Sequence, residues 1–342
     1  MSTDIGSLLA AAPAKPRHAA VRSRLAGAGG YLPERVLTND ELAQTLDTSD
    51  AWIAERTGIR QRHIAGPDDT ACSMGAAAAR AALAAAGAAP SAVDAVLVAT
   101  STPDQAFPAV AVRIQHALGI PGGFALDLSA ACSGFIFALA TADAFIRSGQ
   151  VRYALVIGTE VYSRILNWQD RGTCVLFGDG AGAVLLAAAP GTGSSTDRGL
   201  LSTHLHSDGA LGDILYVDGA VGRRDRPGTL LMNGREVFRH AVARMAEAVD
   251  EALAANNLTH ADVDWLVPHQ ANRRIIDAMG RRLHLPPERV VVTVDRHANT
   301  SAASIPLALA EALADQRIRP GQLVLMEALG GGLTWGSALL RT

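Results

Sequence analysis

The chain repeats itself once, and this repeat limits the possible folds more than any other feature of the sequence. Five short segments recur in the same order, at an offset of roughly 170 residues. The pairs are Ser91–Val98 with Ala261–Val267, Leu118–Pro121 with Leu283–Pro286, Asp127–Ser133 with Asp295–Ser301, Ser148–Gln150 with Pro320–Gln322, and Gly180–Leu186 with Thr334–Leu340. Ala-rich sequence matches itself easily, so one pair could be chance, but the shared order predicts an internal duplication.

Each half alternates between helical and strand patterns. Ala-rich helical segments at 76–88 and 247–256 are each followed by an Asp and an apolar strand, at 95–98 and 265–267. This alternation predicts an α/β fold whose sheets are covered by helices, and two related halves predict a site between them. We expect a disordered Ala/Pro-rich tail at 1–20, an N-terminal half at 21–195 and a C-terminal half at 196–342.

The last pair of segments has a shorter offset of 154 residues, since Gly180 recurs as Thr334. The first half therefore carries an extra stretch, from 161 to about 175. Loops that interrupt one copy of a fold often carry binding residues. We expect this stretch to contact a substrate or another subunit.

Bulk composition argues against several classes of protein. The 342 residues are 49% hydrophobic, and the formal net charge of -3 gives no general attraction to nucleic acid or anionic membranes. Three cysteines, Cys72, Cys132 and Cys174, with no CxxC pair, indicate neither a disulfide framework nor a metal site. The N-terminus lacks a signal-peptide pattern, and no apolar run is long enough to span a bilayer. These features predict a protein of the reducing cytoplasm.

Cys132 is the first candidate for chemistry. The apolar run 123–128 predicts a strand, and the stretch from Gly134 to about Arg147 is apolar at helical spacing without proline. A thiol at this junction faces the positive end of the helix dipole, which favours the nucleophilic thiolate. The alternative is that Cys132 is a small buried hydrophobic residue, as free cysteines often are.

His269 and Asn299 are the second and third candidates. His269 follows the strand that repeats 95–98, and Asn299 precedes a helix expected near Thr300, which the repeat aligns with Cys132. Ends of strands and starts of helices are where an α/β sheet displays functional side chains. Taken singly, His269 could be a hydrogen-bonded structural residue and Asn299 a helix cap.

These residues and the motifs around them resemble β-ketoacyl-acyl-carrier-protein synthase III, a family of condensing enzymes in the thiolase superfamily. The resemblance runs from about Leu25 to Thr342. It rests on Trp52–Arg60, Ala106–Pro108, Asp127–Phe135, Asp170–Thr173, Phe177–Gly182, Val267–Ile275, His297–Ser301 and Gly330–Gly336. The family implies a thiolase-like fold, in which two duplicated α/β halves form a five-layer αβαβα sandwich.

By resemblance, the reaction is the condensation that initiates fatty acid synthesis. Cys132 accepts a short acyl group, expected to be acetyl, from acyl-CoA, and malonyl-acyl-carrier protein then loses CO2 and attacks it. His269 and Asn299 donate hydrogen bonds to the enolate, and the backbone N–H groups of Cys132 and Gly332 form the oxyanion hole. No metal or redox cofactor is implied, because nothing is oxidised or hydrolysed.

The resemblance also implies contacts with acyl-CoA. They are Trp52 and Arg171, which sandwich the adenine, Arg56 near the phosphates, and Gly234 and Asn272 along the pantetheine. Guanidinium and indole groups both stack well on a base. The alternatives are that Trp52 belongs to the core and that Arg171 forms a surface ion pair.

Two macromolecular partners are implied as well. Acyl carrier protein is acidic, and the expected contacts are Arg273 and Arg274, with Arg281 and Arg282 further along the same helix. A run of Arg on a helix is otherwise just a solvated face. Phe107 is expected to close the acyl pocket of a neighbouring subunit, which predicts a homodimer.

Other functions remain open at this stage. A thiolase needs a second catalytic cysteine near the C-terminus, and 327–342 contains none. The alternative on the same fold is an acyltransferase or starter-unit synthase of specialised (polyketide) metabolism, although Asn299 argues for carbon–carbon bond formation. A binding protein on a decayed synthase fold would have no need of an intact Cys132, His269 and Asn299.

Overall fold

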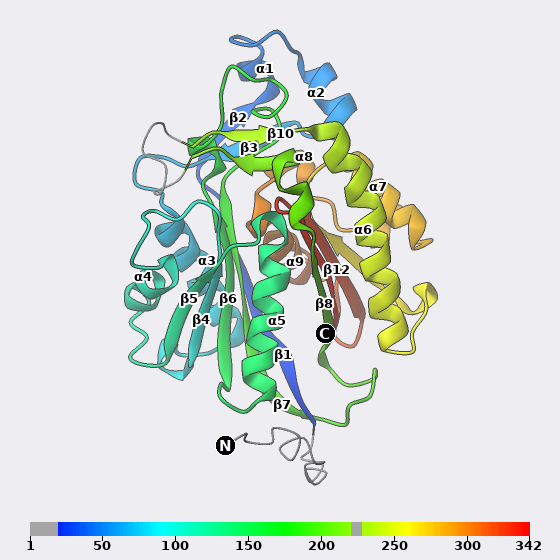
Figure 1. Cartoon of the computed structure of the whole chain (residues 1–342). Helices are drawn as coiled ribbons and strands as arrows, with labels where there is room; N and C mark the ends of the chain where they lie inside the picture. The colour runs from blue at the N-terminus through cyan, green and yellow to red at the C-terminus, as the bar shows by residue number, and fades with distance from the viewer. Residues whose placement is uncertain (1–19, 220–227) are drawn as a thin grey trace, which may run out of the picture.

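The computed structural model describes residues 20–219 and 228–342. Two β-sheets stand in the middle of the molecule, with helices between them and on their outer faces (Figure 1). The tail predicted at residues 1–20 lies outside the described residues, except for Ala20, which begins the first strand.

The first sheet belongs to the N-terminal half. It contains β1 (Ala20–Tyr31), β4 (Ala95–Ala99), β5 (Phe124–Leu128), β6 (Tyr153–Glu160) and β7 (Gly180–Gly191), in the order β1-β7-β6-β4-β5. Strands β5, β4 and β6 pair in parallel, and β7 and β1 extend the sheet in antiparallel pairing.

The second sheet repeats this arrangement. It contains β8 (Gly199–Ser207), β11 (Trp265–Pro268), β12 (Leu323–Gly330) and β13 (Thr334–Arg341), in the order β8-β13-β12-β11. Strands β11 and β12 are parallel, β13 and β8 are antiparallel, and a bridge from Leu266 to Val290 stands where β5 pairs in the first sheet. The shared order confirms the internal duplication. The chain changes sheets between β7 and β8, and we propose the boundary of the halves there, near residue 195.

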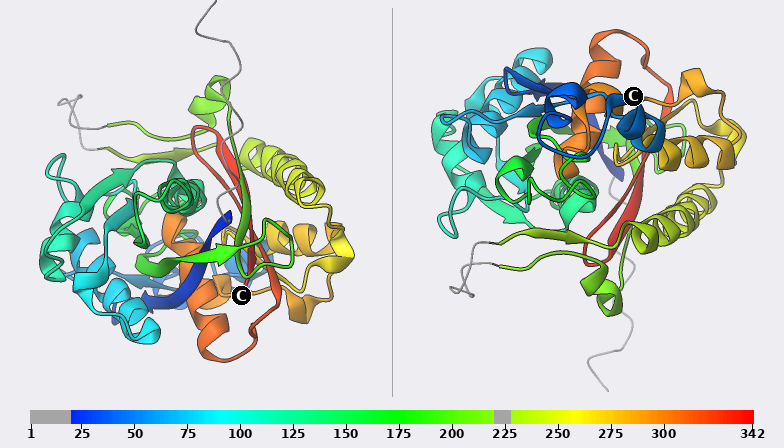
Figure 2. Two further views of the ribbon diagram at one scale, coloured as in Figure 1. Left: turned by 90° about the horizontal axis from the view of Figure 1, so that it is seen from below. Right: turned by 90° about the horizontal axis from the view of Figure 1, so that it is seen from above.

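Helices fill three layers around the two sheets. Between the sheets lie α5 (Gly134–Arg147) and α9 (Ser304–Ala314), whose buried side chains share one core with both sheets. The outer face of the first sheet is covered by α3 (Ala71–Ala86) and α4 (Val110–Ala117), and that of the second by α6 (Gly234–Ala255) and α7 (Arg273–Arg282). The layers can be followed in the two end-on views (Figure 2). The predicted five-layer αβαβα sandwich is therefore confirmed.

Shorter elements gather at the upper end of the molecule in Figure 1. They are β2 (Arg35–Thr38) paired with β3 (Gln61–Ile64), β9 (Leu215–Val217) paired with β10 (Leu230–Met232), and the short helices α1 (Asn39–Leu42), α2 (Asp50–Thr57) and α8 (Val294–His297).

Small residues let α3 lie directly on the first sheet. Most of this helix is alanine, and it packs against glycines of β1. A Cβ atom at Gly29 would come within 2.4 Å of the backbone nitrogen of Ala82, so a larger residue does not fit there. Thr70 caps the start of the helix, and Gly87, with a φ of 60°, ends it.

Two 3₁₀ turns lead into the central helices at equivalent places. Ala131–Ser133 precedes α5 and Ser301–Ala303 precedes α9, and the first residue of each turn has a positive φ, of 45° and 48° respectively. Cys132 therefore corresponds to Ala302 and not, as the sequence repeat suggested, to Thr300. The two Asp residues that anchored the sequence alignment, Asp127 and Asp295, lie in a strand and a helix, so they are not equivalent.

The extra stretch predicted in the first half is present, and it lies in the connection between β6 and β7. The connection from β6 to β7 runs from residue 161 to 179, whereas the connection from β12 to β13 has only residues 331–333. The longer connection contains both Arg171 and Cys174.

Candidate active site

Cys132 lies in the turn that leads into α5, between the two sheets. Its relative exposure is 5%. Burial raises the pKa of its thiol to about 12, and a hydrogen bond with Ser301 acts in the opposite direction. Loss of hydration thus opposes the field of the helix end, which the sequence predicts to favour the thiolate.

His269 directly follows β11. Its backbone N–H donates to the carbonyl oxygen of Glu327 at 2.8 Å, which continues the pairing of β11 with β12. Burial lowers the pKa of the imidazole to about 3, so the ring is neutral and carries one N–H donor. Within residues 20–219 and 228–342, its Nδ1 atom has no hydrogen-bond partner.

Both backbone polar groups of Asn299 form hydrogen bonds. Its N–H donates to the oxygen of Leu176 at 2.9 Å, and its carbonyl accepts from the N–H of Gly178 at 3.0 Å. The side-chain Oδ1 accepts from the N–H of Ser301 at 2.8 Å. Asn299 thus supports the turn before α9, as the helix-cap alternative suggested. Because the oxygen is used there, the NH2 group remains as a donor.

The three side chains line one cavity of about 540 Å³. Cys132 comes from the N-terminal half, and His269 and Asn299 come from the C-terminal half. The structure therefore brings together all three candidates. The apolar wall includes Phe177, which opens one of the motifs above, and residues that the sequence did not single out: Leu215, Met232, Val237, Phe238 and Leu329. These five come from four different elements, and apart from the adjacent pair on α6 no spacing in the sequence marks them as neighbours.

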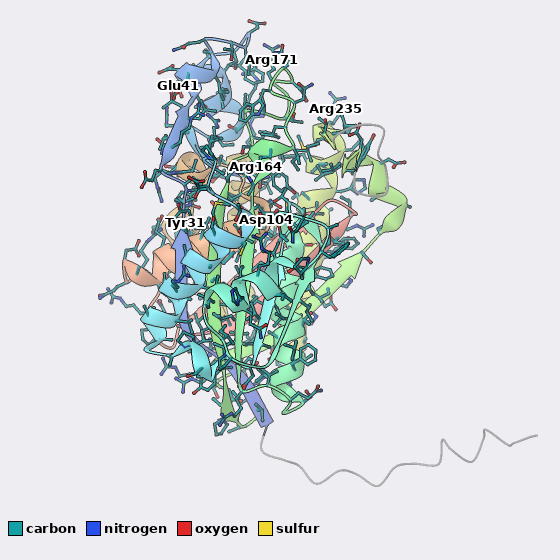
Figure 3. The ribbon with its side chains drawn as sticks, turned by 90° about the vertical axis from the view of Figure 1, so that its left-hand side faces the viewer. Tyr31, Glu41, Asp104, Arg164, Arg171 and Arg235 are labelled. Atoms are coloured by element: carbon teal, nitrogen blue, oxygen red, sulfur yellow. The ribbon has the colours of Figure 1, made fainter. Side chains whose placement is uncertain are left out.

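The expected acyl-CoA contacts line the same cavity, namely Trp52, Arg56, Arg171, Gly234 and Asn272. The Cζ atoms of Arg56 and Arg171 lie 4.6 and 5.0 Å from the ring centroid of Trp52. Arg171 also contacts the main-chain and side-chain oxygens of Asp47, which accounts for the surface ion pair considered above. In Figure 3, Arg171 lies at the upper end of the molecule.

Asn272 has a structural role besides lining the cavity. Its Oδ1 accepts from the N–H of Arg274 at 2.8 Å and so caps α7, and its Nδ2 donates to the carbonyl of Arg56 at 3.2 Å. Asn272 therefore ties α7 to α2. Gly234 is the first residue of α6, on another side of the same cavity.

The glycine that packs against the backbone of Cys132 is Gly330, a packing contact distinct from the oxyanion-hole donor expected at Gly332. A Cβ atom at Gly330 would come within 2.6 Å of the nitrogen of Cys132, whereas one at Gly332 would meet Thr334 at 3.2 Å. Gly332 has a φ of 140°, which favours glycine for its own reason. Three consecutive glycines look alike in sequence, and only packing distinguishes Gly330.

The two arginines predicted to contact the carrier protein have different surroundings. Arg274 lines the cavity, but Arg273 does not: its Nε atom pairs with Asp277 at 2.7 Å, and its side chain packs against Gly58. Phe107 also lies away from the cavity, and it is 84% exposed. Its expected contact is with a neighbouring subunit.

The parts of the chain that the structure describes contain no group of three His, Cys, Asp or Glu side chains that could hold a metal ion. In those same parts, every helix is too short or too polar to cross a membrane.

A duplicated five-layer fold with a cysteine, a histidine and an asparagine around one cavity defines a condensing acyltransferase of the thiolase type. Residues 126–209 match the family model of 3-oxoacyl-[acyl-carrier-protein (ACP)] synthase III, and residues 253–342 match the model of its C-terminal part. The chain belongs to the 3-oxoacyl-[acyl-carrier-protein] synthase III family.

Known proteins similar to this chain agree with that assignment. The β-ketoacyl-[acyl-carrier-protein] synthase III of Acidiphilium cryptum is 74% identical over 320 residues, which cover 94% of this chain and 99% of that protein. The crystal structure of 3-oxoacyl-(acyl carrier protein) synthase III from Pseudomonas aeruginosa is 45% identical, with a TM-score of 0.87 and coverage of 94% and 98%. The priming β-ketosynthase of the R1128 polyketide pathway is 38% identical, with a TM-score of 0.88 and coverage of 96% and 99%. The chain is thus a condensing enzyme that initiates fatty acid synthesis.

Proposed function

We propose that this enzyme joins a short acyl-CoA, expected to be acetyl-CoA, to malonyl-acyl-carrier protein. The products are a 3-ketoacyl-acyl-carrier protein, CO2 and CoA. The proposal is carried by the single cavity that Cys132, His269, Asn299 and Trp52 share. This cavity combines a nucleophile, two hydrogen-bond donors and a surface for the carrier of the acyl group.

In the first half-reaction, the sulfur of Cys132 attacks the acyl-CoA thioester. A bond forms between this sulfur and the acyl carbon, the carbon–sulfur bond to CoA breaks, and the thiol proton of Cys132 ends on CoA. Exchange between two thioesters is nearly isoenergetic, which suits a cysteine nucleophile. By the family resemblance, the backbone N–H groups of Cys132 and Gly332 stabilise charge on the acyl oxygen.

In the second half-reaction, the malonyl group loses CO2, and the electron pair of the broken bond forms an enolate. The enolate carbon attacks the acyl carbon, and the bond to the sulfur of Cys132 breaks. The sulfur leaves as a thiolate, which takes up a proton from solvent. His269 and Asn299 donate hydrogen bonds to the enolate oxygen. A neutral imidazole and an amide suit this role, because neither brings a negative charge next to the enolate. The low pKa of His269 keeps the imidazole neutral at ordinary pH.

Binding of acyl-CoA follows from the residues along the cavity. Trp52 and Arg171 offer flat surfaces for the adenine, Arg56 offers a cation for the phosphates, and Gly234 and Asn272 lie along the path of the pantetheine. A cavity with an apolar inner wall also favours an acyl chain over a polar group.

We further propose acyl carrier protein as the partner, with Arg274 as its main contact and Arg273 as a weaker one. Arg274→Glu should raise the KM for malonyl-acyl-carrier protein by about tenfold at low salt, and less at high salt. Arg273→Glu should have a smaller effect, because Arg273 does not line the cavity. Equal effects of the two changes would contradict the assignment of Arg274.

We also propose that the enzyme is a homodimer and that it acts in the cytoplasm. An aromatic side chain as exposed as Phe107 supports a contact with a second copy of the chain. The proposed chemistry uses no metal or redox cofactor, nucleic acid or membrane. Sedimentation of the native protein and of Phe107→Ser tests the dimer, since the variant should dissociate at a higher concentration.

The second candidate is a starter-unit synthase or another acyltransferase of polyketide metabolism. The 38% identity to a priming β-ketosynthase of a polyketide pathway favours this alternative over others. Both candidates acylate Cys132, and they differ in the acyl group that they take and in what removes it.

Intact-protein mass spectrometry separates the two candidates. The enzyme is incubated with a panel of acyl-CoAs, and malonyl-acyl-carrier protein is then added. We expect a mass gain on Cys132 with acetyl-CoA that disappears as a 3-ketoacyl product forms. An adduct that only an alcohol or amine removes would instead indicate the acyltransferase.

A further inference from the structure

Arg62 is a fully buried cation that the proposed reaction does not use. It lies in β3, at the upper end of the molecule in Figure 1, and its relative exposure is 0%. Its Nη1 atom donates to the carbonyl of Leu37 at 3.2 Å and to Oδ1 of Asn39 at 2.9 Å, and its Nη2 atom donates to the carbonyl of Val175 at 2.8 Å. All three acceptors are neutral, so dipoles offset the cost of burying this charge.

Strand β3 holds both ends of the segment 175–179, which belongs to the long connection between β6 and β7. At one end, the guanidinium of Arg62 binds the carbonyl of Val175. At the other end, the N–H of Asp179 donates to the carbonyl of His63 at 2.9 Å. The position of this segment therefore depends on β3, and at its first end it depends on a side chain.

The middle of the same segment holds Asn299. The hydrogen bonds described above join the backbone of Asn299 to Leu176 and Gly178, and Phe177 between them pairs with Asn299 in a parallel bridge. The side chain of Asn299 lines the cavity. Because its backbone is bonded to the segment on both sides, the direction of its amide depends on where the segment lies.

Asn39 fixes the guanidinium from the opposite side. Its Oδ1 accepts from Arg62, and its Nδ2 donates to the carbonyl of Ile59 and to Oδ1 of Asp50, both at 2.8 Å. Asn39 is itself buried, with a relative exposure of 1%. The guanidinium thus connects two parts of the chain through different nitrogen atoms, as its planar fork allows.

We propose that Arg62 is a positioning residue for the second half-reaction, and that its guanidinium holds the segment 175–179 so that the amide of Asn299 is directed at the enolate. This rests on the proposed role of Asn299 as a hydrogen-bond donor. Arg62 does not line the cavity, so it acts through Asn299 and not on the substrate. A hydrogen bond weakens steeply with angle and distance, so a small shift of the segment slows the reaction.

Arg62→Lys tests this link, because it keeps the charge but offers one ammonium group, which cannot span both Asn39 and Val175. The enzyme is first acylated with acetyl-CoA and then mixed with saturating malonyl-acyl-carrier protein, and mass spectrometry follows the adduct on Cys132. Loss of the adduct should slow by about tenfold, whereas its formation should change by less than about twofold. The KM for malonyl-acyl-carrier protein should stay the same. Equal slowing of both steps would overturn the proposal.

Arg22→Lys is the matched control. Arg22 is also buried, with a relative exposure of 4%, and donates to the carbonyls of Leu201 and Ser194 at 3.1 and 3.0 Å. It lies in β1, pairs with Asp197 at 3.1 Å and does not line the cavity. This variant should lower the melting temperature but leave both rates as in the native protein. A slower loss of the adduct here would show that reduced stability alone explains the effect of Arg62→Lys.

A double-mutant cycle shows whether Arg62 acts through Asn299. In the Asn299→Ala background the amide is absent, so Arg62→Lys should change the loss of the adduct by less than about twofold. Slowing by the same factor in both backgrounds would mean that Arg62 acts independently of Asn299, and the proposal would be wrong.

Asn39→Ala gives the answer if Arg62→Lys does not fold. It keeps the arginine and its bond to Val175 but removes the opposite anchor, so loss of the adduct should slow by about threefold at unchanged acylation. A native rate in this variant would overturn the proposal. Failure of the condensing function itself would appear in the native enzyme, as an adduct that does not form or that malonyl-acyl-carrier protein does not remove.

Discussion

The two halves of this enzyme share one topology and divide the chemistry between them. Equivalent elements begin 170 residues apart, as with the turns at Ala131 and Ser301 and the strands at Tyr153 and Leu323. At that offset the pairs are Cys132 with Ala302, His269 with Ala99, and Asn299 with Ser129. Each candidate for chemistry thus corresponds to a small residue in the other half. One set of reactive groups, rather than two, occupies the space between the sheets.

The connections between the last two strands of each half differ more than the strands do, and each reaches the other half. Residues of the long 161–179 connection hold the backbone of Asn299 through Leu176 and Gly178. The short connection follows Gly330, which packs against the backbone of Cys132. At the site, the two halves therefore contact each other through the two connections that differ most between them.

Cys132→Ser should have the largest effect, and it tests the contribution of the N-terminal half to the reaction. An alkoxide is far harder to form than a thiolate, so acyl transfer should fall by about 10⁴-fold or more, as removal of a nucleophile does in other enzymes. Mass spectrometry after incubation with acyl-CoA gives the result. Cys72→Ser, on the outer helix α3, is the control and should retain the adduct.

His269→Ala and Asn299→Ala should show that the C-terminal half serves the second step. Decarboxylation of malonyl-acyl-carrier protein should fall by about 10²- to 10³-fold, and acylation of Cys132 should fall much less. Asn299→Asp keeps the size of the side chain but places a carboxylate beside the enolate, so it should be at least as harmful. Equal losses in both steps would refute this division of labour.

Gly330→Ala tests the contact made by the short connection. The new methyl group would lie within 2.6 Å of the nitrogen of Cys132, so the turn must shift. We expect acylation to slow by about 10- to 100-fold and the free energy of unfolding to fall by about 1–3 kcal/mol. Gly122→Ala, where a Cβ atom meets no heavy atom within 4 Å, should behave like the native protein.

Trp52→Ala should have the smallest effect. Loss of the ring that Arg56 and Arg171 approach should raise the KM for acyl-CoA by about three- to tenfold. Steady-state kinetics with each substrate varied in turn measures this. A similar rise for malonyl-acyl-carrier protein would mean that Trp52 supports the whole site rather than the CoA.

Much of the fold could be predicted from local sequence patterns. The helix expected from Gly134 to Arg147 has those bounds, and the strand before Cys132 and the extra stretch after residue 161 are where the pattern put them. Apolar periodicity and proline exclusion act over a few neighbouring residues, so they can be read along the chain. The motifs that contain Cys132, His269 and Asn299 also span only a few neighbouring residues, so they can be recognised in the sequence.

The sequence by itself thus determined the α/β class, the duplication and the three residues around the cavity. Only the tertiary structure decided the burial of Cys132, the glycine that packs against it, and the different surroundings of Arg273 and Arg274. The position of Cys132 before a helix was visible in the sequence, but its burial was not. Desolvation and hydrogen bonding depend on groups that are distant along the chain and become neighbours only when the two halves pack together.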